Sequence, residues 1–219
     1  MGQEFFGPVS PFGELEGWQV QGDNPSTTQQ RAQALGSDGD EIAHKEFDKK
    51  TSFSATYVCA EDGAAVPMFG DILNGCHVDQ IAVTFSNTAF VTMTVTGHKH
   101  GGANHPACRK YKGSLTTIAS KFGCPASIVG LTFPTGAGVN SITYTLTGQH
   151  VDVPGSQGEF LAADNYDGVE TVDAELCDSG EITAQTGWSL TSAGNGKSNT
   201  AATTASATAE HHLAHEATT

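Results

Sequence analysis

Four side chains of the kind that bind transition metals lie within GHKHGGANHPAC, residues 97–108. His98 and His100 are two positions apart, so they share one face wherever this segment forms a strand. His105 and Cys108 follow after a Gly-Gly loop. Imidazole nitrogen and thiolate sulfur are ligands of tetrahedral zinc, so His98, His100, His105 and Cys108 form a candidate zinc site. A loop that contains histidines by chance is the more frequent explanation, and we expect no metal and no cofactor.

Other patterns typical of catalytic or binding sites fail on spacing. GNGKS, residues 194–198, resembles the end of a phosphate-binding loop, but Thr191 stands where the motif needs its first glycine. Asp164 and Asp167 lack the spacing of a calcium-binding loop and are interpreted as part of a turn. The chain has no Gly-x-Ser-x-Gly motif. We therefore predict no catalytic residues and no enzyme.

Charge and cysteine content exclude several classes of protein. The chain carries 24 acidic and 10 basic side chains, a net charge of -14. Broad binding to nucleic-acid phosphates needs clustered Lys and Arg, whereas DNA can pass an acidic surface without adhering. Five cysteines, an odd number without a Cys-x-x-Cys pair, argue against a disulfide framework. No apolar stretch reaches the ~18 residues that span a bilayer, and the start lacks a basic n-region. We expect a protein made without secretion or membrane contact.

The elements that would position these residues are β-strands. Residues 41–59 predict a strand and alternate in their second half, with Phe53, Ala55, Tyr57 and Cys59 on one face. An Asp-Gly turn at residues 37–40 directly precedes this segment. Residues 78–98 predict two strands around a Ser-Asn-Thr break. Further strands are predicted at residues 139–151, 168–177 and 181–191, while residues 115–122 fit a helical turn or a strand. The pattern predicts a mainly β fold: a β-sandwich or barrel of about ten strands with long loops and an extended N-terminal arm.

Three segments make up the predicted domain organisation. Residues 1–16 hold three phenylalanines among prolines and glycines, which is typical of an arm that docks on its own subunit or on a neighbour. Residues 17–210 form a single β domain. Residues 211–219 form a C-terminal tail, in which His211, His212 and His215 are weaker metal candidates than the loop histidines.

One phrase is written twice in the chain. SNTAFVTMTVTGHKH, residues 86–100, returns 112 residues later as SNTAATTASATAEHH, residues 198–212. In both copies a short apolar strand precedes the phrase. The repetition predicts the internal duplication of a hairpin unit.

The order and style of these segments also resemble a known family. GWQVQGD, TTQQRAQALGSDGDEIAHKEF, SFSATYVC, DQIAVTFSNTAFVTMTVTGHKH and GEFLAADNYDGVETVDAEL, spread over residues 17–208, are similar to the virion structural proteins of tailed bacteriophages, in particular tail tube (major tail) proteins. The resemblance implies a β-sandwich or barrel subunit that closes into hexameric rings. Such rings stack into a hollow tube around the tape measure protein and later conduct DNA, and the family offers no catalytic residues.

This resemblance implies partners and a place. The expected partners are other copies of the chain, the tape measure protein and other tail proteins, with DNA passing through without specific binding. The protein would be made in the host cytoplasm and would end in the virion tail. We expect residues 1–16 and the loop around residues 97–113 to make contacts between subunits.

Two alternatives remain open at this point. A capsid decoration or other head protein would share the composition and the strand style. A metal-dependent β-fold enzyme would need His98, His100, His105 and Cys108 to hold an ion.

Overall fold

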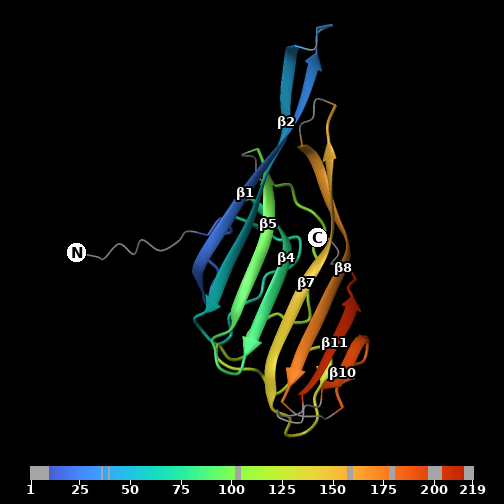
Figure 1. Cartoon of the computed structure of the whole chain (residues 1–219). Helices are drawn as coiled ribbons and strands as arrows, with labels where there is room; N and C mark the ends of the chain where they lie inside the picture. The colour runs from blue at the N-terminus through green and yellow to red at the C-terminus, as the bar shows by residue number, and fades with distance from the viewer. Residues whose placement is uncertain are drawn as a thin grey trace, which may run out of the picture.

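The computed structural model shows a sheet of long antiparallel strands (Figure 1). The structure describes residues 10–35, 37–38, 40–101, 105–156, 160–177, 181–196 and 204–214. Within these ranges there are eleven strands and no helix. The strands are β1 (Trp18–Leu35), β2 (Glu41–Cys59), β3 (Ile72–Leu73), β4 (Cys76–Ser86), β5 (Thr92–His100), β6 (Leu131–Thr132), β7 (Val139–Pro154), β8 (Phe160–Leu176), β9 (Thr183–Ala184), β10 (Ser189–Gly196) and β11 (Thr204–His212). The prediction of a mainly β fold is confirmed.

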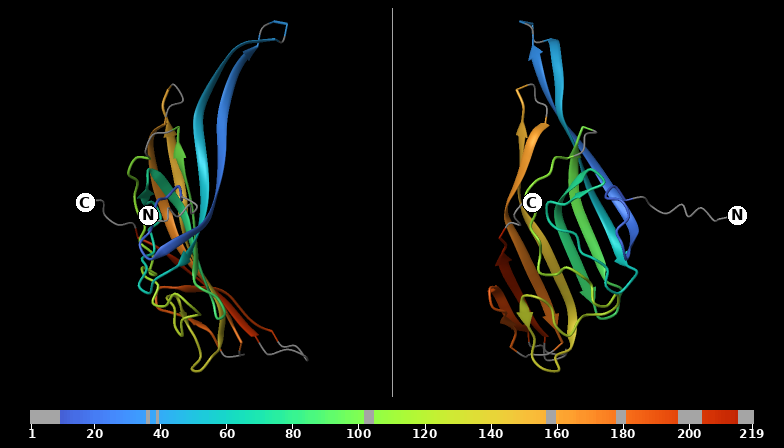
Figure 2. Two further views of the ribbon diagram at one scale, coloured as in Figure 1. Left: turned by 90° about the vertical axis from the view of Figure 1, so that its left-hand side faces the viewer. Right: turned by 180° about the vertical axis from the view of Figure 1, so that it is seen from behind.

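The large sheet is open. Its strand order is β1-β2-β5-β4-β7-β8-β11-β10, with β3 paired to β4, and all of these pairs are antiparallel. β6 and β9 form a separate two-stranded sheet. The large sheet does not close into a barrel, and loops cover one of its faces, as Figure 2 shows from behind. This arrangement is compatible with the sandwich alternative, and it leaves β1 and β10 as the two edges.

Alternation along the strands produces two unlike faces. Tyr57, Met93 and Tyr144 are fully buried and belong to a core cluster that the covering loops complete. This burial follows the predicted period of two, and β2 begins at Glu41, directly after the predicted turn. The residues between the buried ones, as in TMTVT of β5 and TYTLT of β7, are mostly threonines. The sheet therefore has an apolar face and a hydroxyl-rich face.

The covering loops pack on the sheet and are joined to one another by short backbone bridges. Val66 N–H donates to the Thr116 carbonyl and Ile118 N–H donates to the Ala64 carbonyl. Two glycines allow aromatic rings to lie on the strands, because a Cβ at Gly148 would stand 2.3 Å from the Phe69 ring. A Cβ at Gly168 would stand equally close to Tyr111. The segment 115–122 makes isolated bridges and forms neither of the two predicted elements.

Two pairs of strands extend beyond the covered part of the sheet (Figure 1). β2 pairs with β5 only over Lys50–Val58, so residues 41–49 have β1 residues 30–35 as their described strand partner. We call residues 30–35 and 41–49 the β1–β2 ribbon. β7 and β8 likewise pair with each other alone over residues 149–154 and 160–166, which we call the β7–β8 ribbon. Both ribbons extend from the same end of the sheet.

Three of the predicted segments can be compared with the structure. Residues 10–16 of the predicted arm dock on the same subunit, one of the two alternatives expected, where Phe12 is buried against Phe53 and the Ser10 hydroxyl bonds to the Tyr57 hydroxyl. Residues 1–9 lie outside the described part. β11 runs to His212, so the first two residues of the predicted tail belong to the sheet. The strand predicted at residues 181–191 is wrong in its extent, because it divides into β9 and β10 around a turn.

Both copies of the repeated phrase contain a nine-residue strand at the same offset. β5 occupies Thr92–His100 and β11 occupies Thr204–His212, and each pairs with the strand before it. Met93 and Val95 are buried in the first copy, as are Ala205 and Ala207 in the second. Residues 198–203 lie outside the described part. Duplication of a hairpin unit remains a prediction.

Candidate metal centre

Seven side chains rich in metal-binding atoms gather where the covered sheet ends and the β1–β2 ribbon begins. In chain order, Lys50 is the first β2 residue that pairs with β5, and its partner is His100. We call the group the histidine cluster. Its members are His77 and Asp79 from β4, His98 and His100 from β5, His105 from the covering loop, and His150 and Asp152 from β7.

Local sequence explains how three strands deliver these residues. His77 of β4 pairs directly with His98 of β5, next to a register irregularity between Val78 and Gln80. In β5 the alternation of buried residues shifts by one position at Gly97, so both His98 and His100 are buried. The tripeptide His-Val-Asp occurs twice, at residues 77–79 and 150–152. In each strand it places an imidazole and a carboxylate two positions apart.

Asp79 orients two of the imidazoles. Its carboxylate accepts hydrogen bonds from Nδ1 of His77 at 2.8 Å and from Nδ1 of His98 at 2.7 Å. Burial opposes ionisation of Asp79, but these two histidines outweigh it and hold the carboxyl pKa well below its usual range. Burial lowers the pKa of His77. Burial also acts to lower the pKa of His98, but its carboxylate neighbours Asp152 and Asp79 outweigh burial and raise it.

The imidazoles of His105 and His150 are also oriented by a hydrogen-bond acceptor at Nδ1. Nδ1 of His105 lies 2.9 Å from the Pro106 carbonyl, and Nδ1 of His150 lies 2.7 Å from Oδ1 of Asn165. The Asn165 amide is itself oriented, because its Nδ2 donates to the Arg109 carbonyl at 2.7 Å. A carbonyl or carboxylate oxygen only accepts, so Nδ1 carries the proton in all three rings of His98, His105 and His150. In each neutral ring, Nε2 is then left with a lone pair.

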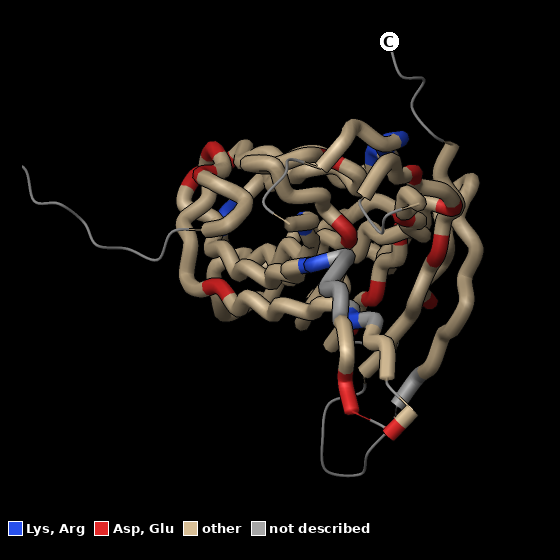
Figure 3. The backbone as a smooth tube through the Cα atoms, turned by 90° about the horizontal axis from the view of Figure 1, so that it is seen from above, with Lys and Arg blue, Asp and Glu red and all other residues tan. Residues whose placement is uncertain are grey.

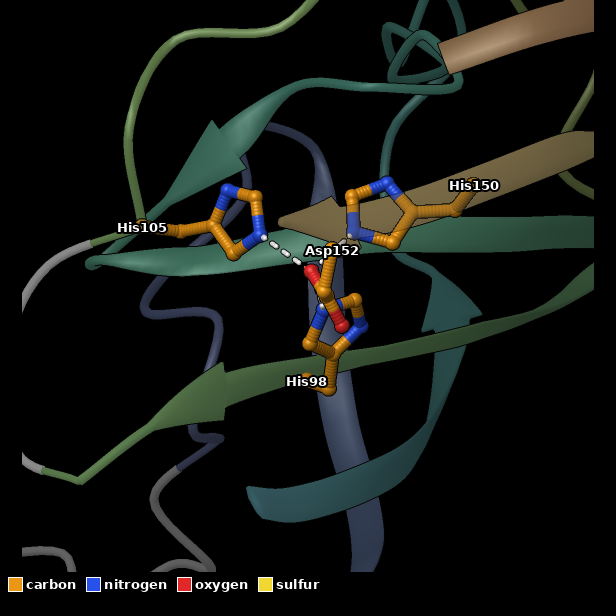
Figure 4. Close-up of side chains that lie close together, drawn as sticks. All are labelled: His98, His105, His150 and Asp152. Carbon is orange, nitrogen blue, oxygen red and sulfur yellow. Dashed lines mark hydrogen bonds and ion pairs between the residues drawn. The ribbon is translucent and has the colours of Figure 1, made fainter. Parts of the chain in front are cut away.

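These three lone pairs converge on Asp152 (Figure 4). Nε2 lies 2.7 Å from Asp152 Oδ1 in His150, 3.8 Å in His105 and 3.9 Å in His98. One ligand atom from each of the four residues falls within 4.8 Å of all the others. Within the described ranges, Nε2 of His98 and of His105 is buried and has no hydrogen-bond partner.

The second carboxylate oxygen of Asp152 has partners of its own. Oδ2 lies 3.1 Å from Lys50 Nζ and 3.1 Å from His100 Nε2. Burial acts to raise the pKa of Asp152, but His105, His150, His98 and Lys50 outweigh it and hold this pKa far below its usual range. Asp152 is therefore an anion at neutral pH, with one oxygen directed at the three imidazoles.

The sequence-predicted metal candidates divide into two groups. His98 and His105 reach the common point, and His100 contacts the other oxygen of Asp152. Cys108 falls in a separate set with His77 and His150, and burial raises the pKa of its thiol to about 11. The set around Asp152 therefore contains two of the four predicted residues, His98 and His105, together with His150 and Asp152.

Sequence reasoning missed His150 and Asp152. They lie more than forty residues beyond the histidine-rich loop, and only the pairing of β7 with β4 brings them close. The repeated His-Val-Asp was the signal that could have found them. Of the tail candidates, His211 and His212 lie in β11, where they contact Glu170 and Asp167, and His215 lies outside the described residues.

A second buried polar group contrasts with the histidine cluster. Glu170 of β8 is fully buried and accepts hydrogen bonds from Tyr144 at 2.8 Å, from Ser114 N–H at 2.7 Å and from the Ser114 hydroxyl at 2.5 Å. Nδ1 of His211 lies 2.8 Å from Oε1 of Glu170, the oxygen that also accepts from the Ser114 hydroxyl. Burial, and then the charge of Glu170, raise the pKa of Tyr144. We call this group the Glu170 network.

An apolar pocket of about 500 Å³ lies beneath the covering loops, apart from both polar groups. The residues that line it are Phe85, Leu115, Thr117, Ala119, Ser120, Pro125, Ser127, Ile128, Val129 and Gln185. These residues include no acid, base or thiol. Its lining includes Ser and Thr hydroxyls, but no basic side chain of the lining stands beside them to activate them.

Comparison with protein families and curated proteins adds nothing to the geometry described above. No model of a protein family and no curated protein matches the chain. None of the residues that the structure describes forms a helix of the length and apolarity needed to cross a membrane.

Proposed function

We propose that the chain is a structural subunit that assembles with copies of itself, as the tail tube subunit of a tailed bacteriophage does. The observation that carries the proposal is the β1–β2 ribbon, in which every residue whose burial is described is exposed. The β7–β8 ribbon is contacted by the covering loop, where Arg109 binds Asp164 and Asn165, but it also exposes apolar side chains. An isolated two-stranded ribbon is marginally stable in water, so each ribbon needs a surface to lie on. Another copy of the chain supplies that surface.

The side chains of the ribbons support contact with protein. In the β1–β2 ribbon, Ile42 is 71% exposed and Leu35 is 55% exposed. The β7–β8 ribbon exposes Val151, Val153, Leu161 and Tyr166. Few large apolar side chains are exposed elsewhere in the described ranges, so this concentration indicates an interaction surface.

The open edges support closure into a ring. β1 lies at one edge of the sheet and β10 at the other. Unlike edges on opposite sides of one subunit allow head-to-tail contacts, which close into a ring when the rotation per subunit permits it. A ring of six is the number that the family resemblance implies.

The hydroxyl-rich face suits the wall of a conduit. Neighbouring strands place Thr92 opposite Thr84, Thr84 opposite Thr143 and Thr143 opposite Asp173. Asp173 is exposed, and acidic positions outnumber basic ones along the backbone (Figure 3). Such a face is hydrated and repels phosphate, so a DNA duplex would pass it without adhering.

Electron microscopy of negatively stained, purified chain tests the proposal. We expect six-fold rings or tubes from the native chain and dispersed subunits from the double variant Leu35→Asp, Ile42→Asp. Phe122→Asp is the matched control, because Phe122 is a half-exposed apolar residue outside both ribbons, and it should assemble normally. Trimers would favour the capsid decoration alternative. Dispersed native subunits at every concentration would overturn the proposal.

A further inference from the structure

We propose that His98, His105, His150 and Asp152 bind one divalent transition-metal ion, with zinc as the best match to three imidazoles and a carboxylate. This site is independent of the proposed assembly. Zinc binds imidazole nitrogen and carboxylate oxygen in a tetrahedron. The four residues come from β5, β7 and the covering loop, so an ion would join three parts of the fold.

The first argument is the direction of the lone pairs. The acceptors at Nδ1 fix the tautomers of all three rings, so each neutral Nε2 presents a lone pair to the carboxylate oxygen. Nε2 of a neutral His150 and Oδ1 of Asp152, 2.7 Å apart, are two acceptors that repel each other unless a proton or a metal ion lies between them. Buried polar atoms are otherwise almost always hydrogen-bonded, yet Nε2 of His98 and of His105 is not, within the described ranges.

The second argument is size. Zinc ligands at about 2.0–2.1 Å in a tetrahedron stand about 3.3 Å from one another. The three Nε2 atoms lie 2.7, 3.8 and 3.9 Å from Asp152 Oδ1, which brackets this value. Rotations of the side chains by roughly half an ångström at the donor atoms bring these three distances to the tetrahedral one.

The third argument is the support behind each ligand. Metal-binding imidazoles almost always donate their second N–H to a carboxylate, a carbonyl or a water. Here Asp79 supports His98, the Pro106 carbonyl supports His105, and Asn165 supports His150. An accidental collection of histidines would not need each ring held in the same tautomer.

Four protein ligands define a closed site. Catalytic zinc keeps a position open for water or substrate, whereas structural zinc has all four positions filled by the protein. The ion would lie beside Lys50, at the root of the β1–β2 ribbon, and at the start of the β7–β8 ribbon. Its role would be to fix the point from which both ribbons extend.

The experiment is a titration of the chelator-stripped full chain with zinc, followed by calorimetry, and with cobalt, followed by visible absorption. We expect one ion per chain and the intense cobalt bands of a tetrahedral site. His105→Gln and Asp152→Asn should each weaken zinc binding at least tenfold. Asp79→Asn, which removes support and no ligand, should weaken it by about 10- to 100-fold.

A matched control separates this site from surface histidines. His212→Gln alters an exposed histidine of β11 and should bind zinc as the native chain does. Circular dichroism of each stripped variant shows whether it is folded, and the cobalt spectrum of the native chain needs no variant at all. Weak octahedral cobalt bands in the native chain, or equal zinc binding by native chain and His105→Gln, would overturn the proposal.

Discussion

The covered body of the sheet and the two ribbons are built from the same strands but stabilised differently. In the body, β2, β5, β4 and β7 have neighbours on both sides and a core beneath them, where Tyr57 and Tyr144 have no exposed surface. In the β1–β2 ribbon, every residue whose burial is described is exposed. β2 is therefore half core strand and half projecting arm, whereas β1, in its described part, contributes Trp18 alone to the buried core.

The difference shows how far along its strands a single subunit is stabilised by its own core. Burial of apolar side chains is the main favourable contribution to folding, and it stops where β2 leaves β5. Backbone pairing continues far beyond that point. Strands that extend beyond the core leave unpaired backbone groups exposed in a monomer. In an assembly, the same strands can pack against other copies of the chain.

Removing the β1–β2 ribbon should have the largest effect, a complete loss of assembly. We expect a chain in which a short glycine linker replaces residues 31–47 to remain folded but to lose assembly entirely, because the ribbon contributes little to the core. Size-exclusion chromatography with light scattering measures the mass, and urea unfolding should show a loss of less than about 1 kcal/mol. A shortened chain that unfolds would mean that the ribbon belongs to the body.

The Glu170 network should show the opposite behaviour, as a feature of the body alone. Glu170→Ala leaves the Tyr144 and Ser114 donors buried without their acceptor, so we expect a loss of about 3–5 kcal/mol in the free energy of unfolding. Tyr144→Phe removes a single donor and should cost about 1–3 kcal/mol. Urea denaturation measures both losses. Equal losses in the two variants would contradict the network as described.

Zinc should stabilise the boundary between the two regions. A ligand present at about 100 times its dissociation constant adds about 2.7 kcal/mol to the free energy of unfolding. We expect this gain in the native chain and none in His150→Gln, measured as the thermal midpoint with and without zinc. The His212→Gln variant should gain as much as the native chain.

The smallest effect is expected from the ion pair of Arg109 with Asp164. The Arg109 guanidinium lowers the pKa of the Asp164 carboxyl to about 2. A lowered pKa in the folded state gives stability that is present above about pH 4, the pKa of an unfolded aspartate, and is lost as the pH falls towards 2. Both side chains are about two-fifths exposed, so water screens the pair and the effect should be small.

Asp164→Asn should therefore lower the thermal midpoint slightly at pH 7. At pH 2 its midpoint should match that of the native chain. A difference that persists unchanged at pH 2 would show that the substitution acts through packing and not through charge.

Much of the body could be predicted from local sequence. The period of two gave β2 and β5 because each strand has one apolar face, and the Asp-Gly turn marked the start of β2. The start of β8 at Phe160 was not predicted, because residues 160–167, FLAADNYD, have no alternation of apolar and polar side chains. The short β6 and β9 carry too few residues for any pattern.

The candidate site was half predictable for a similar reason. His98 and His105 are close in sequence, so their spacing alone placed them together. His150 and Asp152 join them through the order of strands in the sheet, which no local pattern contains. Cys108 lies in a different set of potential ligands, with His77 and His150.

Amide hydrogen exchange of the ribbons tests self-assembly most directly. In dissociated subunits, the amides of residues 30–35 and 41–49 should exchange rapidly, while those of β4 and β5 are protected. In the assembled state, we expect the ribbon amides to become protected as well. Ribbon amides that exchange equally fast in both states, or a chain that never leaves the monomeric state, would contradict the claim that copies of the same molecule cover the ribbons.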